Sequence, residues 1–178
     1  MQRTFNRIWI LLLVGVSWAW AQQPPEMPKA GPEQQRLRYF VGDWRTEGEM
    51  KASPFGPAGK LMGTDHAVML GDFFVVTNSD SRGPMGSMKA ISTLAYDSKE
   101  KIYTYDEYTS LGEHELSKGT VSGDTWTWTS YEEMGGKTMK GRFTLKQVSP
   151  TSYTFKFEMS EDGNSWTTVM EGKSTKTK

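Results

Sequence analysis

The sequence contains no cysteine among its 178 residues. Disulfides and thiolate metal ligands are therefore excluded, and burial and strand pairing must hold the fold together. A lipid anchor on an N-terminal cysteine is excluded as well. Histidine is scarce too: His66 and His114 stand 48 positions apart, and neither has a ligand-spaced partner such as a helical His-Glu-x-x-His pattern. We therefore expect no metal site.

A long apolar run is also missing. The apolar stretch at residues 8–16 follows two arginines and precedes the small-residue pattern Ala19-Trp20-Ala21. It is too short for a bilayer-spanning helix, which needs roughly 20 residues, and the pattern is typical of a secretory signal peptide. We predict a signal peptide over residues 1–21 and an exported protein, periplasmic or secreted. An uncleaved N-terminal anchor is the alternative.

The sequence lacks an excess of basic residues. Removal of Arg3 and Arg7 with the predicted signal peptide leaves 19 basic against 21 acidic residues, a formal charge of −2 with neutral histidines. A nucleic-acid partner usually needs a basic face, so we expect none. Residues 22–31 are rich in proline and predict a flexible lead-in, and residues 32–178 predict a single domain.

Short alternating patterns fill the chain after one predicted helix. Residues 32–41 begin with proline, carry apolar residues on one face and end before Gly42, which predicts a short amphipathic helix. From Asp43 onward apolar and polar residues alternate with a period of two, and turn dipeptides interrupt the pattern. The predicted strands cover residues 43–50, 60–70, 73–80, 88–97, 102–110, 113–121, 125–129, 139–146, 153–159 and 166–175.

This organisation predicts an all-β protein, an antiparallel calycin-like β-barrel of about ten strands with one short N-terminal helix. An outer-membrane barrel would present apolar residues to lipid, whereas the outer faces predicted here are polar. We therefore expect a soluble protein that does not span a membrane after processing. A two-sheet sandwich has the same pattern of inward and outward residues and stays open as an alternative.

Several runs resemble the bacterial family called domain of unknown function 1579. They are Ser53-Pro54-Phe55-Gly56-Pro57, Gly83-Pro84-Met85-Gly86, Lys118-Gly119-Thr120-Val121, Gly123-Asp124-Thr125-Trp126-Thr127-Trp128 and Ser149-Pro150-Thr151-Ser152-Tyr153. The resemblance covers nearly all of the chain after residue 21. It implies the fold and no activity, because that family carries none that is established.

A more remote resemblance concerns the run from Gly42 to Gly48, which is similar to the opening strand of nitrobindin-like and lipocalin-like barrels with its Gly-x-Trp. The nitrobindin resemblance implies a haem bound by a histidine late in the chain. This sequence has Thr46 in place of that family's second glycine, and no histidine after His114. We therefore expect no cofactor, since a haem would need His66, His114 or an unusual tyrosine or methionine ligand.

Barrels of this size often enclose a small ligand. The candidate cavity residues are Trp44, His66, Asn78, Tyr105, Tyr108, His114, Trp126, Trp128 and Phe155. We expect His66 to point inward with Met62, Thr64, Val68 and Leu70, which share its strand face. The alternatives are ordinary packing for the aromatic residues, a wall or rim position for His66 and a solvated hairpin end for His114.

No catalytic signature accompanies this cavity. Asp106 and Glu107 are adjacent on a strand and point to opposite faces, and a Gly-x-Ser-x-Gly elbow is absent. The leading hypothesis is a non-enzymatic binder or carrier of a small apolar or amphipathic molecule. The alternatives are an enzyme that uses His66 as acid or base, and a filled barrel with a structural or protein-interaction role.

The predicted signal peptide can be tested directly. Export should remove residues 1–21, because the Ala19-Trp20-Ala21 pattern places cleavage before Gln22. Intact-mass spectrometry of the exported protein should show a chain that begins at Gln22. A mature protein that retains Met1 would contradict the prediction.

Overall fold

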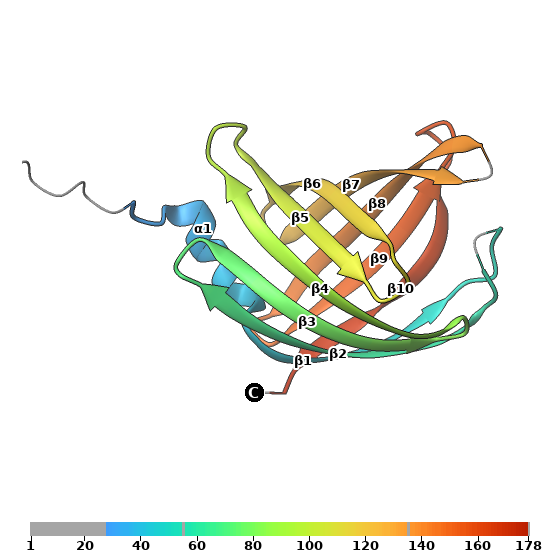
Figure 1. Cartoon of the computed structure of the whole chain (residues 1–178), viewed down its shortest axis with the longest axis horizontal. Helices are drawn as coiled ribbons and strands as arrows, with labels where there is room; N and C mark the ends of the chain where they lie inside the picture. The colour runs from blue at the N-terminus through green and yellow to red at the C-terminus, as the bar shows by residue number, and fades with distance from the viewer. Residues whose placement is uncertain (1–27, 55, 135, 178) are drawn as a thin grey trace, which may run out of the picture.

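Ten antiparallel strands form a closed barrel in the computed structural model, which describes residues 28–54, 56–134 and 136–177 (Figure 1). The strands are β1 (Gly42–Met50), β2 (Gly59–Leu70), β3 (Phe74–Gly83), β4 (Gly86–Asp97), β5 (Ile102–Thr109), β6 (His114–Ser122), β7 (Thr125–Met134), β8 (Lys137–Ser149), β9 (Ser152–Ser160) and β10 (Thr167–Lys176). The prediction of an all-β barrel of about ten strands is confirmed, and the sandwich alternative is wrong because β1 pairs with β10. The predicted signal peptide lies outside the described residues.

One short helical segment covers an end of the barrel (Figure 1). The α-helix α1 (Pro32–Arg36) continues into the 3-10 helix η1 (Leu37–Phe40), so the predicted helix exists but tightens in its second half. Its start is capped by Gln34, whose side-chain oxygen accepts the Gly31 N–H at 3.0 Å. Leu37 is fully buried against the barrel. None of the described helical residues belongs to a helix long and apolar enough to cross a membrane.

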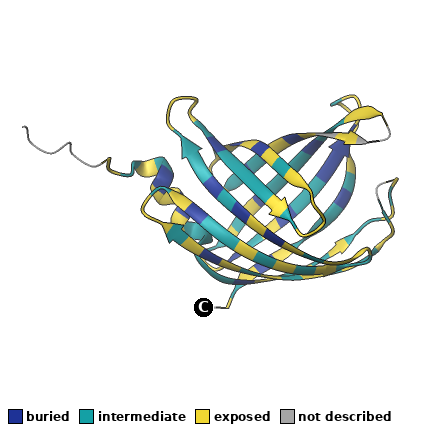
Figure 2. Cartoon of the chain, in the orientation of Figure 1, coloured by how far each residue is buried: buried dark blue, intermediate teal, exposed yellow. Residues whose placement is uncertain are grey.

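The core lies at the end of the barrel that the helix covers. Buried residues alternate with exposed ones along most strands, as Figure 2 shows. The core cluster comprises Leu37, Ala67, Val75, Leu94, Tyr103, Trp126, Trp128 and Leu145. The Tyr103 hydroxyl donates a hydrogen bond of 3.2 Å to the backbone oxygen of Glu33. The helix is therefore tied to the barrel by both apolar packing and hydrogen bonds.

Two glycines let aromatic rings pack closely against the backbone of the wall. A Cβ atom at Gly119 would lie 2.5 Å from the Trp128 ring, and one at Gly172 would lie 2.6 Å from the Phe155 ring. Any larger residue would therefore push these rings toward the centre of the barrel. The two glycines help to keep the centre open.

Trp44 joins the helical segment to the first strand. Its indole N–H donates to the backbone oxygen of Phe40 at 2.7 Å, and its ring lies 5.0 Å from that of Tyr153. Only 3% of the residue is exposed. The side chain therefore links η1, β1 and β9.

Replacement of Trp44 should test this junction. Trp44→Ala should lower the free energy of unfolding by about 3–5 kcal/mol, the usual range for a buried large aromatic residue. Trp44→Phe keeps a ring against Tyr153 but removes the indole donor to Phe40, so it should cost less. Denaturant unfolding measures both values. Equal midpoints for Trp44→Ala and the parent would show that Trp44 does not anchor the junction.

Candidate ligand cavity

The barrel encloses a cavity of about 400 Å³. Side chains from all ten strands line it, together with Phe40 of η1. Cavities that bind small molecules usually measure about 300–1,000 Å³, so this volume suits a compact ligand. The interior is therefore not completely filled by the protein's own side chains.

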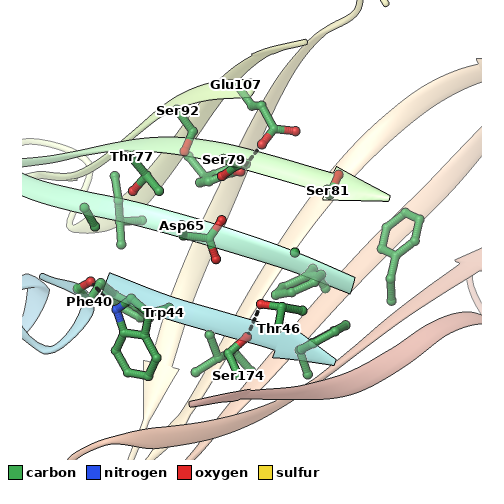
Figure 3. Close-up of a pocket in the computed structure, with 18 of the residues that line it drawn as sticks. Phe40, Trp44, Thr46, Asp65, Thr77, Ser79, Ser81, Ser92, Glu107 and Ser174 are labelled. Carbon is green, nitrogen blue, oxygen red and sulfur yellow. Dashed lines mark hydrogen bonds between the residues drawn. The ribbon is translucent and has the colours of Figure 1, made fainter. Parts of the chain in front are cut away.

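One side of the cavity carries most of its polar side chains, beside apolar residues such as Ala67, Val75 and Leu94. The polar side chains that β2 to β6 contribute are Asp65, Thr77, Ser79, Ser81, Ser92, Tyr105, Glu107, Glu115 and Ser117. Figure 3 shows Asp65, Ser79 and Glu107 pointing into the same interior space. The register explains the grouping, because Thr77 pairs with Ser92, Ser92 with Glu107 and Glu107 with Glu115. A continuous polar row therefore crosses four neighbouring strands, and we call the whole set the polar wall.

Three carboxyl groups belong to the polar wall. Glu107 accepts a hydrogen bond from the Tyr105 hydroxyl, and Glu115 accepts one from the Ser117 hydroxyl. Glu107 and Glu115 also stand directly opposite each other on β5 and β6. Like charges in that arrangement repel across the strands. Ionisation of both glutamates is therefore electrostatically unfavourable.

Burial raises the pKa of two of these carboxyl groups. For Glu107 desolvation is the largest cause, and the charge of Glu115 raises its pKa further, while the Tyr105 hydrogen bond lowers it. Burial likewise raises the pKa of Asp65, partly offset by a hydrogen bond from Ser79. Two acidic residues of the polar wall therefore have raised pKa values caused mainly by burial, a pattern that also occurs at functional sites.

The opposite side of the cavity is aromatic. Its residues from β7 to β10 are Trp128, Phe143, Leu145, Tyr153, Phe155, Phe157 and Met170, with Ser174 as a small polar exception. The Phe143 and Phe155 rings stack with centroids 5.8 Å apart. In the closed strand order, β7 to β10 lie across the barrel from β2 to β5. This aromatic wall therefore faces the polar wall across the cavity.

The two walls differ in charge as well as polarity. Three carboxyl groups line the cavity, whereas lysine, arginine and histidine are absent from its lining within the described residues. The described part of the chain also holds no group of three or more histidine, aspartate or glutamate residues that could bind a metal ion. The cavity is thus acidic and amphipathic.

Four predicted residues line this cavity: Trp44, Tyr105, Trp128 and Phe155. Trp126 also points inward, but it packs beneath the helix, where its ring lies 5.0 Å from Phe40. It is 1% exposed and does not reach the cavity. The placement of Trp126 in the cavity is therefore wrong, and a binding role for the other four stays a prediction.

The inward orientation predicted for His66 and Asn78 is wrong. They pair with each other on β2 and β3 and both are exposed on the outer surface. His66 Nδ1 lies 2.6 Å from Asp43 Oδ1, outside the barrel. The prediction failed because both faces of β2 carry apolar residues, so alternation alone did not orient the strand. Asp65, rather than His66, points into the cavity.

Tyr108 and His114 also lie on the outer surface. Their rings stack with centroids 4.5 Å apart, and His114 Nε2 lies 2.7 Å from Asp106 Oδ1. Their predicted place in the cavity is wrong, because the inward face of β5 carries Tyr105 and Glu107 instead. Neither histidine of the chain reaches the cavity, so neither could bind a haem there.

Sequence reasoning missed the three carboxyl groups and most of the hydroxyls of the polar wall. A signal was present in β3, where small hydroxyl residues alternate with Asn78, Asp80 and Arg82. The small residues face the cavity, and the larger polar residues face water. Size, rather than hydrophobicity, distinguishes the two faces of this strand.

Comparisons with known proteins agree with this fold. A family described as protein of unknown function (DUF1579) matches residues 29–176. Among solved structures, the crystal structure of Rv2717c from M. tuberculosis aligns with a TM-score of 0.56 and 12% identity, covering 84% of this chain and 100% of that one. The S-type phycobiliprotein lyase CPES from Guillardia theta aligns with a TM-score of 0.53 and 9% identity, covering 83% and 96%. No curated protein matches the chain.

Glu107→Gln should stabilise the protein at neutral pH. Because the pKa of Glu107 is raised, the folded state binds more protons than the unfolded state between about pH 4.3 and the raised value, so stability falls as pH rises across that window and stays lower above it. Glutamine keeps an acceptor for Tyr105 and removes the charge. The variant should melt higher at pH 7.5, by about 2–4 °C per kcal/mol gained, and match the parent below pH 4.

The matched control is Asp106→Asn, which removes a carboxylate from the outer face of the same strand. Thermal unfolding followed by circular dichroism at several pH values measures both variants. A Glu107→Gln protein that melts below the parent at pH 7.5 would contradict the assigned burial.

Proposed function

The chain belongs to the DUF1579 family, and we propose that it is a binding protein that holds a small, partly apolar molecule in the barrel cavity. The cavity carries this proposal, because about 400 Å³ of interior space lies between an aromatic wall and a wall of hydroxyl and carboxyl groups. Such a combination of apolar surface with a few orienting polar groups suits ligand recognition. The two solved structures share the fold at 9–12% identity, which does not assign an activity to this chain.

Binding without chemical conversion suits the side chains available. An enzyme that uses His66 as acid or base is disfavoured, because His66 contacts Asp43 on the outer surface. The serines of the polar wall have no histidine near them that could activate a hydroxyl nucleophile. A purely structural barrel is disfavoured by the open interior. We further propose that the protein meets its ligand after export, on the strength of the signal-peptide pattern in residues 1–21.

A variant that fills the cavity tests the proposal. Gly63 lines the cavity, and a Cβ atom there would have only ordinary contacts, at 3.5 Å from Ser81 Cβ and 3.6 Å from Thr46 Cβ. Gly63→Phe should therefore project a ring into the cavity without breaking the wall. The neutral fluorescent probe N-phenyl-1-naphthylamine should bind the parent and quench its interior tryptophans. Its affinity should fall at least about tenfold in the variant.

The matched control is Thr64→Phe, which adds the same ring to the exposed face of the same strand. It should leave probe binding unchanged. Equal binding by the parent and Gly63→Phe would place the probe elsewhere on the protein. Absence of binding by the parent, for this probe and for a wider set of neutral and charged aromatic compounds, would overturn the proposal.

A further inference from the structure

The charged side chains that line the cavity indicate which class of ligand it would bind. We propose, building on the binding function above, that the ligand is an organic cation: a protonated amine or quaternary ammonium group attached to an apolar body. The ammonium group lies against the polar wall, and the apolar body lies against the aromatic wall.

The first step concerns charge balance. Asp65, Glu107 and Glu115 line the cavity, and the lining contributes no cationic side chain within the described residues. The Lys176 ammonium group lies 4.8 Å from the Trp44 ring centroid, but it donates to the Tyr39 backbone oxygen at the helix-covered end. Partly buried carboxylates without a counter-ion are costly to a protein. A cationic ligand would supply the missing partner.

The second step concerns the position of the carboxyl groups. Glu107 and Glu115 face each other across neighbouring strands, so one ammonium group placed between them would interact with both. Hydroxyl groups of Ser92 and Ser117 lie on the same wall and add further acceptors for its protons. Binding would therefore replace the repulsion between the two carboxylates with an attraction of each carboxylate to the ammonium group.

The third step concerns the opposite wall. The faces and edges of Trp128, Phe143 and Phe155 offer apolar contact for the body of the ligand. Aromatic rings also attract an ammonium group through their π electrons. An anionic ligand would find neither a cationic partner nor a favourable wall, and a neutral one would leave the carboxylates uncompensated. A bare metal ion is disfavoured because the described acidic groups form no metal-binding cluster.

The test uses three compounds with the same apolar body and different charge. They are 4-phenylbutylammonium, 4-phenylbutanol and 4-phenylbutyrate. Each is titrated against the whole chain from Gln22 onward, in competition with N-phenyl-1-naphthylamine. The ammonium compound should bind at least about tenfold more tightly than the alcohol, and the carboxylate should bind most weakly.

Two double variants test which carboxyl groups cause the preference for the ammonium compound over the alcohol. Glu107→Gln/Glu115→Gln removes the facing carboxylates of the cavity and should lower the affinity for the ammonium compound about tenfold, with little change for the alcohol. Asp106→Asn/Glu113→Gln removes the same charge from Asp106 on the outer face of β5 and from the exposed Glu113, and should leave the preference intact. Circular dichroism melting verifies that both variants fold.

The outcomes separate this inference from the proposed function. If the neutral probe binds the parent but the alcohol or the carboxylate binds as tightly as the ammonium compound, the cation inference is overturned and the binding function stands. A preference that survives in Glu107→Gln/Glu115→Gln would also overturn it. If neither the probe nor any of the three compounds binds, the proposed function fails and the inference fails with it.

Discussion

The hydrogen-bonded pairing of β1 with β10 is the constraint on which the rest of the structure depends. It closes the sheet, removes both free edges and requires ten strands to surround one interior. Close approach of these two strands needs Gly48 opposite Gly172, because a Cβ atom at either would lie 2.5 Å from a backbone oxygen of the other strand. The helix covers one end of this ten-stranded barrel, and the aromatic side chains pack against its wall. The barrel therefore encloses a cavity.

The two halves of the barrel differ in the inward side chains that they contribute, and therefore in how much they stabilise the fold. The strands β7 to β9 place large aromatic residues inside, which bury apolar area and stiffen the wall. The strands β2 to β6 also place carboxyl and hydroxyl groups inside, beside apolar residues such as Ala67, Val75 and Leu94, and these polar groups gain less from burial. The facing carboxyl groups of Glu107 and Glu115 repel each other and cost stability. A local loss of folding stability of this kind is typical of residues that serve binding rather than folding.

The sequence predicted the barrel well and the cavity only in part. Alternation oriented β7 and β9 correctly, because Trp126, Trp128 and Phe155 are large apolar residues with polar neighbours. It misplaced His66, since β2 exposes Val68 and Leu70 and turns Asp65 into the cavity. The rule that apolar residues point inward fails where the interior is a polar-walled cavity rather than a packed core. The register that brings Glu107 opposite Glu115 requires the folded sheet.

The absence of cysteine allows the most direct measurement of the central claim, that the interior is an accessible acidic cavity. Ser81→Cys places a thiol in the cavity lining, and Thr120→Cys places one on the outer surface. We expect the ratio of modification rates by a cationic and an anionic methanethiosulfonate reagent to be at least about tenfold higher at position 81 than at 120. Equal ratios at the two positions, or a thiol at 81 that reacts only after unfolding, would contradict the claim.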